Sequence, residues 1–118
     1  MNIRRYLLET LNNPKLLNLL TDRRIYFLHA ETPKTPYLEY EIVSEYGAEY
    51  SEGKEDYTNY IVQVDIFSNT NYSEIEEVLK QVMKDAGFNR SSGADLYEEK
   101  TKLYHKAMRF NINLPSED

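Results

Sequence analysis

Three residues in this sequence have side chains suited to proton transfer or metal binding: Asp65, His29 and His105. Asp65 lies between Val64 and Ile66, and a carboxylate in an apolar pocket can act as a general base. We favour two other positions for it: the solvent face of a strand beside Gln63, or a pair with an arginine across a sheet. Neither histidine has a partner at the spacing of a metal site, so we expect both to be structural or exposed.

Other chemical signatures are weak. Glu39, Glu41 and Glu45 are close to a two-residue repeat, which suits either a row of metal ligands or a solvated strand face; we favour the second, since charges protect a sheet edge from further pairing. The four glycines are scattered and form no phosphate-binding loop. There is no cysteine, which removes thiol chemistry and suits a reducing compartment. We therefore expect no enzyme and no catalytic, cofactor or metal residues.

Composition is that of one soluble globular domain spanning residues 1–118, with a frayed tail at 115–118. The formal net charge is −6, which argues against wrapping nucleic acid, because neutralising phosphates requires clustered Lys and Arg. The sequence shows no membrane-spanning run and no signal-peptide core. Eleven tyrosines occur without a tryptophan. Tyrosine suits surfaces buried against a partner, although sheet tyrosines with hydroxyls in water are the simpler interpretation of any one of them.

The clearest structural pattern is at residues 57–88. Residues 57–67 alternate with period two, which predicts a half-buried strand whose inner face carries Tyr60, Val62, Val64 and Ile66. After a polar turn at 68–71, apolar residues recur at helical spacing and predict an amphipathic helix over 73–86. A capping box is expected at the start of this helix, from Ser73 and Glu76, and a glycine stop at its end, from Gly87.

The flanking segments complete this strand–helix unit. Helices are predicted over 3–11 and 15–20, the second capped by Asn13 ahead of Pro14. Strands are predicted over 23–30, 37–46, 95–99 and 103–114, with a loop at 89–94 and a tight turn at 99–102. The order of elements predicts an α+β fold. Its mostly antiparallel sheet of four to five strands carries the N-terminal helix and the long helix (about 73–86) on one face.

Residues 47–56 are polar and join two long strands. This predicts a hairpin with a projecting tip. The segment is either a plain hairpin loop or a tip that carries a binding function, and the residues alone leave both interpretations open.

Four stretches together resemble a known family: LLTDRRIYFLHA (19–30), PYLEYEIVS (36–44), YIVQVDIFSNTNYSEIEEVLKQV (60–82) and GADLYEEKTKLYHKAMRFNINL (93–114). The most specific pieces are VDIFS followed by a helix, at 64–68, and LYHKAMRF at 103–110. Together with the leucine-rich N-terminal helix they look like the tail-completion proteins of long-tailed bacteriophages and prophages. The resemblance covers residues 3–114, and the segment 47–56 departs from it.

The resemblance implies a structural virion protein that caps the tail tube as a hexameric ring and joins tail to head. Its implied partners are further copies of itself, the tail-tube protein and the head connector. DNA would pass through the lumen without specific binding, and acidic residues would suit such a lumen. The implied location is the host cytoplasm during assembly and then the head–tail interface of the virion.

For contacts between subunits we select two groups of residues. The first is on the 47–56 segment and its border: Tyr46, Tyr50, Glu52 and Lys54. The second is a set of arginines that would pair with acids of the next subunit, for which surface solvation is the simpler interpretation: Arg4, Arg5, Arg23 and Arg24. A second hypothesis, based on the acidic charge and tyrosines, is an acidic protein-binding module of the inhibitor or immunity type.

Overall fold

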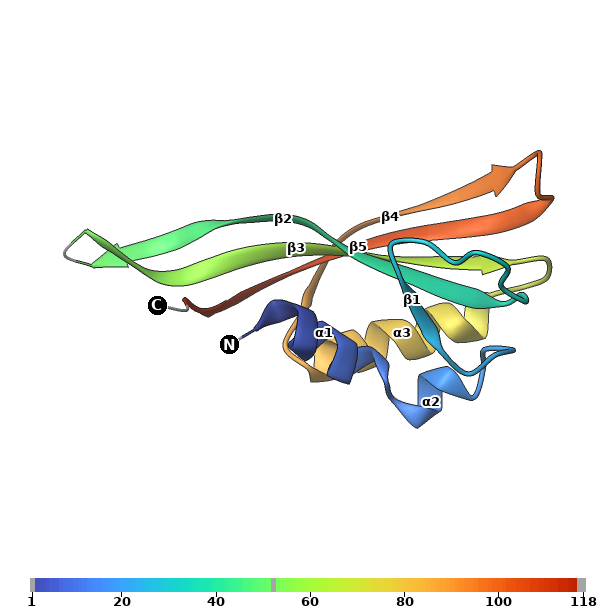
Figure 1. Ribbon diagram of the computed structural model, residues 1–118, viewed down its shortest axis with the longest axis horizontal. Coiled ribbons are helices and arrows are strands. Elements are labelled where there is room, and N and C mark those ends of the chain that lie inside the picture. The colour runs from blue at the N-terminus through green and yellow to red at the C-terminus, as the bar shows by residue number, and fades with distance from the viewer. Residues whose placement is uncertain (1, 52, 117–118) are drawn as a thin grey trace.

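The computed structural model describes residues 2–51 and 53–116, and the side chains of these residues except 48–51, 54 and 55. This part of the chain forms three helices and five strands (Figure 1). The helices are α1 (Ile3–Leu11), α2 (Pro14–Leu17) and α3 (Ser73–Asp85). The strands are β1 (Ile25–Phe27), β2 (Tyr37–Ser51), β3 (Lys54–Ser68), β4 (Asn89–Glu98) and β5 (Leu103–Pro115).

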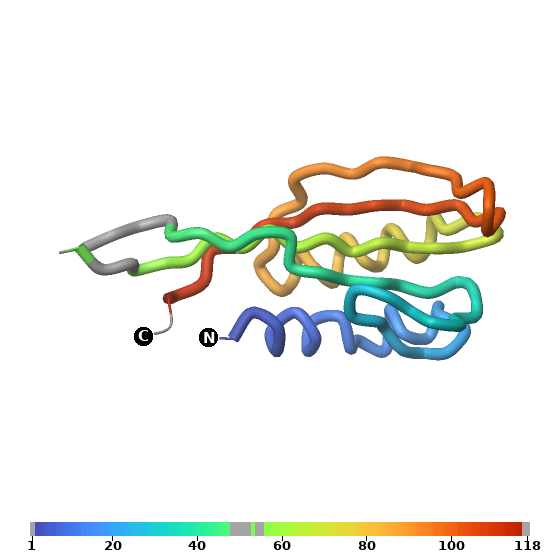
Figure 2. Tube along the Cα trace, turned by 45° about the horizontal axis from the view of Figure 1, so that its top comes forward, coloured from blue at the N-terminus to red at the C-terminus, as the bar shows by residue number. Residues whose placement is uncertain are grey.

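The strands form one sheet in the order β1-β2-β3-β5-β4. Every neighbouring pair is antiparallel except β1 and β2, which are parallel. All three helices lie on one side of the sheet, and the opposite face is open (Figure 1). Figure 2 shows β4 at one edge and β1 with α1 at the other. The predicted α+β class, the mostly antiparallel sheet and the helices on one face are confirmed.

The core lies between the helices and the inner face of the sheet. It forms where the helical stripes meet the alternate residues of the strands, as the two periodicities require. From the helices it takes Leu7, Leu11, Leu16, Leu79 and Met83, and from the sheet Leu38, Val62, Val64, Ile66, Met108 and Phe110, each at most 1% exposed. The inner face predicted for the strand at 57–67 is therefore correct.

The helix ends differ in part from expectation. Asn13 caps α2 as predicted, its Oδ1 accepting from the Lys15 N–H at 2.9 Å. The capping box at α3 is wrong: Ser73 is already the first helical residue, and the Oδ1 of Asn71 accepts its N–H at 2.8 Å. The stop at Gly87 is correct, because its φ of +92° lies in the left-handed region that favours glycine.

The projecting hairpin predicted around residues 47–56 is present, but most of its described residues are strand rather than loop. β2 and β3 continue as a two-stranded ribbon almost to its tip, with Gly47 opposite Thr58 and Ser51 opposite Lys54. We call residues 46–59 the arm. In Figure 1 the arm points away from the helices, and the molecule is 52 Å long but only 28 Å and 24 Å across. Polar residues and glycine suggested a loop, but hydrogen bonds between the strands extend past the apolar segment.

Two further segments differ in length. The strand predicted at 23–30 is reduced to Ile25–Phe27, because Arg23 (φ 50°) and Leu28 (φ 64°) adopt left-handed backbone on either side. Residues 89–94, predicted as a loop from their serines and glycine, form the first half of β4. There the pairing with β5, rather than residue propensity, determines the structure.

None of the described helices is long and apolar enough to span a membrane.

Candidate interaction surfaces

Asp65 is buried on the open face of the sheet, with 6% of its surface exposed. Its Oδ1 lies 2.7 Å from Nε2 of His105 on β5 and accepts from Nε2 of Gln63 at 2.9 Å. The predicted position on the open face beside Gln63 is correct, but Asp65 is buried there rather than solvated, and its partner across the sheet is a histidine rather than an arginine. The nearby arginine, Arg109, instead donates from Nε to Oε1 of Gln63 at 2.9 Å.

His105 is held by the hydrogen bond at Nε2 and by stacking of its ring, and a second carboxylate lies near its other nitrogen. Nδ1 lies 4.0 Å from Oε2 of Glu98, and the ring stacks on Phe67 with centroids 4.2 Å apart. Tyr37 stacks on the other side of Phe67 at 4.9 Å. Burial, with the nearby Glu39 and Glu98, raises the pKa of Tyr37 to about 12. The 2.7 Å contact between Asp65 and His105 joins β3 to β5, and we call this pair the clamp.

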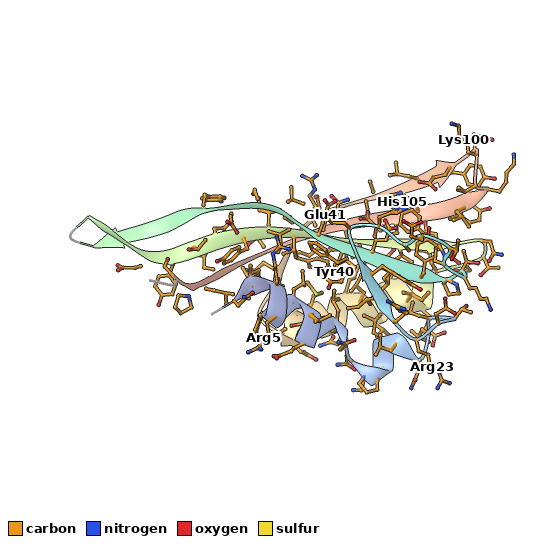
Figure 3. The ribbon with its side chains drawn as sticks, viewed as in Figure 1. Arg5, Arg23, Tyr40, Glu41, Lys100 and His105 are labelled. Carbon is orange, nitrogen blue, oxygen red and sulfur yellow. The ribbon has the colours of Figure 1, made fainter. Side chains whose placement is uncertain are left out.

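The glutamate row does not form a ligand set. Glu39 accepts the Ala30 N–H at 2.9 Å through Oε2, which also lies 3.8 Å from Nδ1 of His29. Glu41 lies on the open face (Figure 3), and Glu45 is exposed on the next stretch of β2. Among the described residues, no group of three or more His, Cys, Asp and Glu side chains could hold a metal ion. The solvated face is therefore correct for Glu45, whereas Glu39 holds the turn after β1.

A hollow of about 650 Å³ opens between the start of α3, β4 and β5, and no pattern in the sequence indicates it. Inside it the Tyr72 hydroxyl donates to Asp95 at 2.6 Å. Nζ of Lys106 lies 3.4 Å from a Glu76 carboxylate oxygen and 3.2 Å from one of Asp95. These groups satisfy one another, so the hollow has no unpaired charge among the described residues with which to bind a ligand.

The contacts in this hollow shift the pKa values of the residues that form them. The hydrogen bond to Asp95, together with burial, raises the pKa of Tyr72 to about 12. The same hydrogen bond and Lys106 lower the pKa of Asp95. Burial alone would raise the pKa of Glu76, but Lys80 and Lys106 outweigh it and lower that pKa. These contacts therefore connect α3 to β4 and β5 within one chain.

The residues selected on the 47–56 segment all belong to the arm. Tyr46 stands at its root and is 55% exposed. Tyr50 and Lys54 are in the paired strands, but their side chains are outside the described set, and Glu52 lies outside the described residues altogether. Tyr57, which the sequence did not single out, is 40% exposed on the opposite strand.

The selected arginines lie far from the arm tip. The guanidinium of Arg4 lies over the ring of Phe27, 5.0 Å from its centroid, and that of Arg24 lies over Tyr26 at 4.7 Å. Arg5 is on α1, and Arg23 lies beyond α2 at the end of the molecule opposite the arm (Figure 3). One chain therefore does not bring its arm and its N-terminal arginines together.

Comparison with known proteins adds no relative: no family model matches the sequence, and no curated protein matches it significantly.

Proposed function

We propose that this protein is a structural virion component that caps the phage tail tube and joins tail to head, as a hexameric ring. The single observation that supports this most is the arm, a ribbon that leaves the body with none of the described helices beneath it. Together with the resemblance over residues 3–114, it favours a subunit whose stability and function are completed by neighbours.

The arm has the composition of a protein–protein interface. Its exposed tyrosines, Tyr46 and Tyr57, combine a large apolar ring with a hydroxyl, the composition enriched at protein interfaces. In the proposed ring the arm meets a different surface on the next copy. Contacts of this head-to-tail kind produce closed rings when the rotation closes.

In the proposed assembly the ring binds the last ring of tail-tube protein on one side and the head connector on the other. DNA passes through the lumen without specific binding, and an excess of Asp and Glu there would keep phosphates from adhering. The subunit is made in the host cytoplasm and ends at the head–tail interface. This function requires no enzyme activity, cofactor or metal.

The test is the length of tails assembled with and without the protein. Electron microscopy of particles made without it should show overlong tubes and tails without heads. A variant lacking residues 49–55 should fold but give the same defect, whereas alanine substitutions in the exposed turn at 99–102 serve as the matched control and should leave tail length normal. Normal tails in the complete absence of the protein would refute the proposal.

The same preparation tests the inhibitor alternative, which the net charge of −6 also suits. An inhibitor would form a one-to-one complex with a basic partner, and mass measurement of the complex separates this from a ring or a capped tube end.

A further inference from the structure

The turn after β1 holds a large apolar side chain in an unfavourable backbone conformation. Leu28 has a φ of 64°, a region that leucine rarely adopts and that glycine or asparagine takes more easily. The turn is closed by the His29 N–H, which donates to the Phe27 carbonyl at 2.7 Å, and by the Leu28 N–H, which donates to the Tyr40 carbonyl at 2.9 Å. The side chain gains little burial in return, since it is 56% exposed.

Leu28 belongs to a small exposed cluster that we call the knob: Arg4, Phe27 and Leu28. Phe27 is 39% exposed and rests on Tyr40, with ring centroids 5.5 Å apart. The guanidinium of Arg4 covers the Phe27 ring, and among the described residues it has no carboxylate partner. The knob is therefore an apolar tip next to a cation that forms no ion pair with the described residues, at the β1 edge of the sheet.

Basic residues are in excess in residues 1–36, and acidic residues are in excess in the arm. Residues 1–36, which include the knob, contain six Lys or Arg (Arg4, Arg5, Lys15, Arg23, Arg24, Lys34) and three acids (Glu9, Asp22, Glu31). The arm contains four acids (Glu49, Glu52, Glu55, Asp56) and one lysine (Lys54). An acidic ribbon with exposed tyrosines matches an apolar tip beside an arginine, because tyrosine rings pack on leucine and also attract a guanidinium.

The arm of the same chain cannot cover the knob. Phe27 is paired with Tyr40 at the start of β2, and the arm is the far part of that same strand, leading away from β1 (Figure 1). We infer that the knob receives the arm of a second copy, with Tyr57 and Asp56 near Leu28 and Arg4. The inference rests on the proposed ring for its biological use, but the contact itself is measurable with the purified chain.

The first experiment exploits the absence of native cysteine. A chain carrying Leu28→Cys is mixed with a chain carrying Tyr57→Cys at high concentration and oxidised. The expected product is a disulfide-linked heterodimer. Leu96→Cys replaces Leu28→Cys in the matched control, since Leu96 is also exposed, at 49%, but lies on β4 at the opposite edge; it should give little product. Equal cross-linking by both cysteines would overturn the inference.

The second experiment separates association from folding. Leu28→Asn removes the apolar tip and suits the backbone better, so the unfolding midpoint should stay equal or rise while self-association weakens by about tenfold or more in sedimentation velocity. Arg4→Glu should also weaken association, and Asp56→Arg added to it should restore part of the loss. A lower midpoint with unchanged association would show that Leu28 only supports its own chain. A wild-type chain that stays monomeric at millimolar concentration would also refute the contact.

Other occupants give other results. Binding of the wild-type chain to anionic phospholipid vesicles, lost in Leu28→Asn without any self-association, would assign the knob to a membrane surface and overturn the inference. The proposed function fails separately. If arm and knob cross-link but tails lacking the protein have normal length, the contact stands and the tail role falls. If tails are overlong but the cross-link does not form, the tail role stands and the contact falls.

Discussion

β2 and β3 run through two different environments in one molecule. In the body their inner residues meet the helices, and Leu38, Val62 and Ile66 have no exposed surface. In the arm the same two strands keep their hydrogen bonds with no described helix beneath them. Only the root at 57–59 also pairs with β5, and Tyr46 is 55% exposed. Backbone pairing alone therefore carries the ribbon beyond the core, although an isolated two-stranded ribbon is marginally stable in water.

The pairing of β2 with β3 is regular in the body and becomes irregular toward the arm. From Tyr37 opposite Phe67 to Ile42 opposite Val62 the pairing is unbroken, and irregularities follow at 42/44, 47/49 and 49/50. Bulges increase the twist of a ribbon and turn its edges away from simple sheet extension. The root is further held by β5 and the residue after it, since β3 pairs with β5 at 57–59 and the hydroxyls of Thr58 and Ser116 lie 3.0 Å apart. The body is thus specified by packing, and the arm by pairing and by its anchored root.

The largest expected effect on the free energy of unfolding comes from removing a core side chain of the body. Phe110→Ala removes a ring that is 1% exposed and should lower the free energy of unfolding by about 3–5 kcal/mol. Tyr46→Ala in the arm, also a loss of an aromatic ring, should change it by about 0.5 kcal/mol or less. Urea denaturation of both variants makes the measurement; equal losses would mean that the arm is part of the cooperative core.

The next effect concerns the clamp on the open face. In a double-mutant cycle of Asp65→Ala and His105→Ala, the unfolding free energies should show a favourable coupling of about 0.5–3 kcal/mol, because the two side chains share a 2.7 Å hydrogen bond. Gln63→Ala with Asn113→Ala, two polar residues farther apart on the same face, serves as the control pair. If the losses of unfolding free energy in the two single variants simply add, Asp65 and His105 do not stabilise the fold through their contact.

A smaller effect is expected in alkaline solution. The pKa of Tyr72 is raised from 10 to about 12 in the folded chain, so its contribution to stability is complete below pH 10 and is lost as the pH rises from 10 to 12. Tyr72→Phe should make the unfolding midpoint fall less steeply across that window, with Tyr37 still contributing. Midpoints measured at several pH values test this, and Tyr46→Phe is the control. An unchanged slope in Tyr72→Phe contradicts it.

The smallest effect on folding should come from shortening the arm. Removal of residues 49–55, with the ends rejoined by Asn-Gly, should alter the free energy of unfolding by about 1 kcal/mol or less, since the arm packs on no helix. Circular dichroism and urea denaturation measure this. A chain that no longer folds would show that arm and body are one unit, and would weaken the view of the arm as a surface reserved for neighbours.

The sequence alone determined the elements whose signals are local. The alternation at 57–67 and the helical stripe at 73–86 are long and regular, so β3, α3 and their buried faces follow from residue spacing. The α+β order of the elements follows in the same way. The run at 25–28, however, is equally apolar, and nothing in its residues distinguishes the buried Ile25 from the exposed tip at Phe27 and Leu28.

Only the tertiary structure decided the rest, because it depends on register between strands distant in sequence. Asp65 and His105 are 40 residues apart and meet because β3 pairs with β5. Serine and glycine at 89–94, like the polar residues at 47–56, favour turns locally, but the hydrogen bonds of a neighbouring strand outweigh that preference. The hollow beside α3 likewise depends on how that helix packs beside β4 and β5, which no single segment determines.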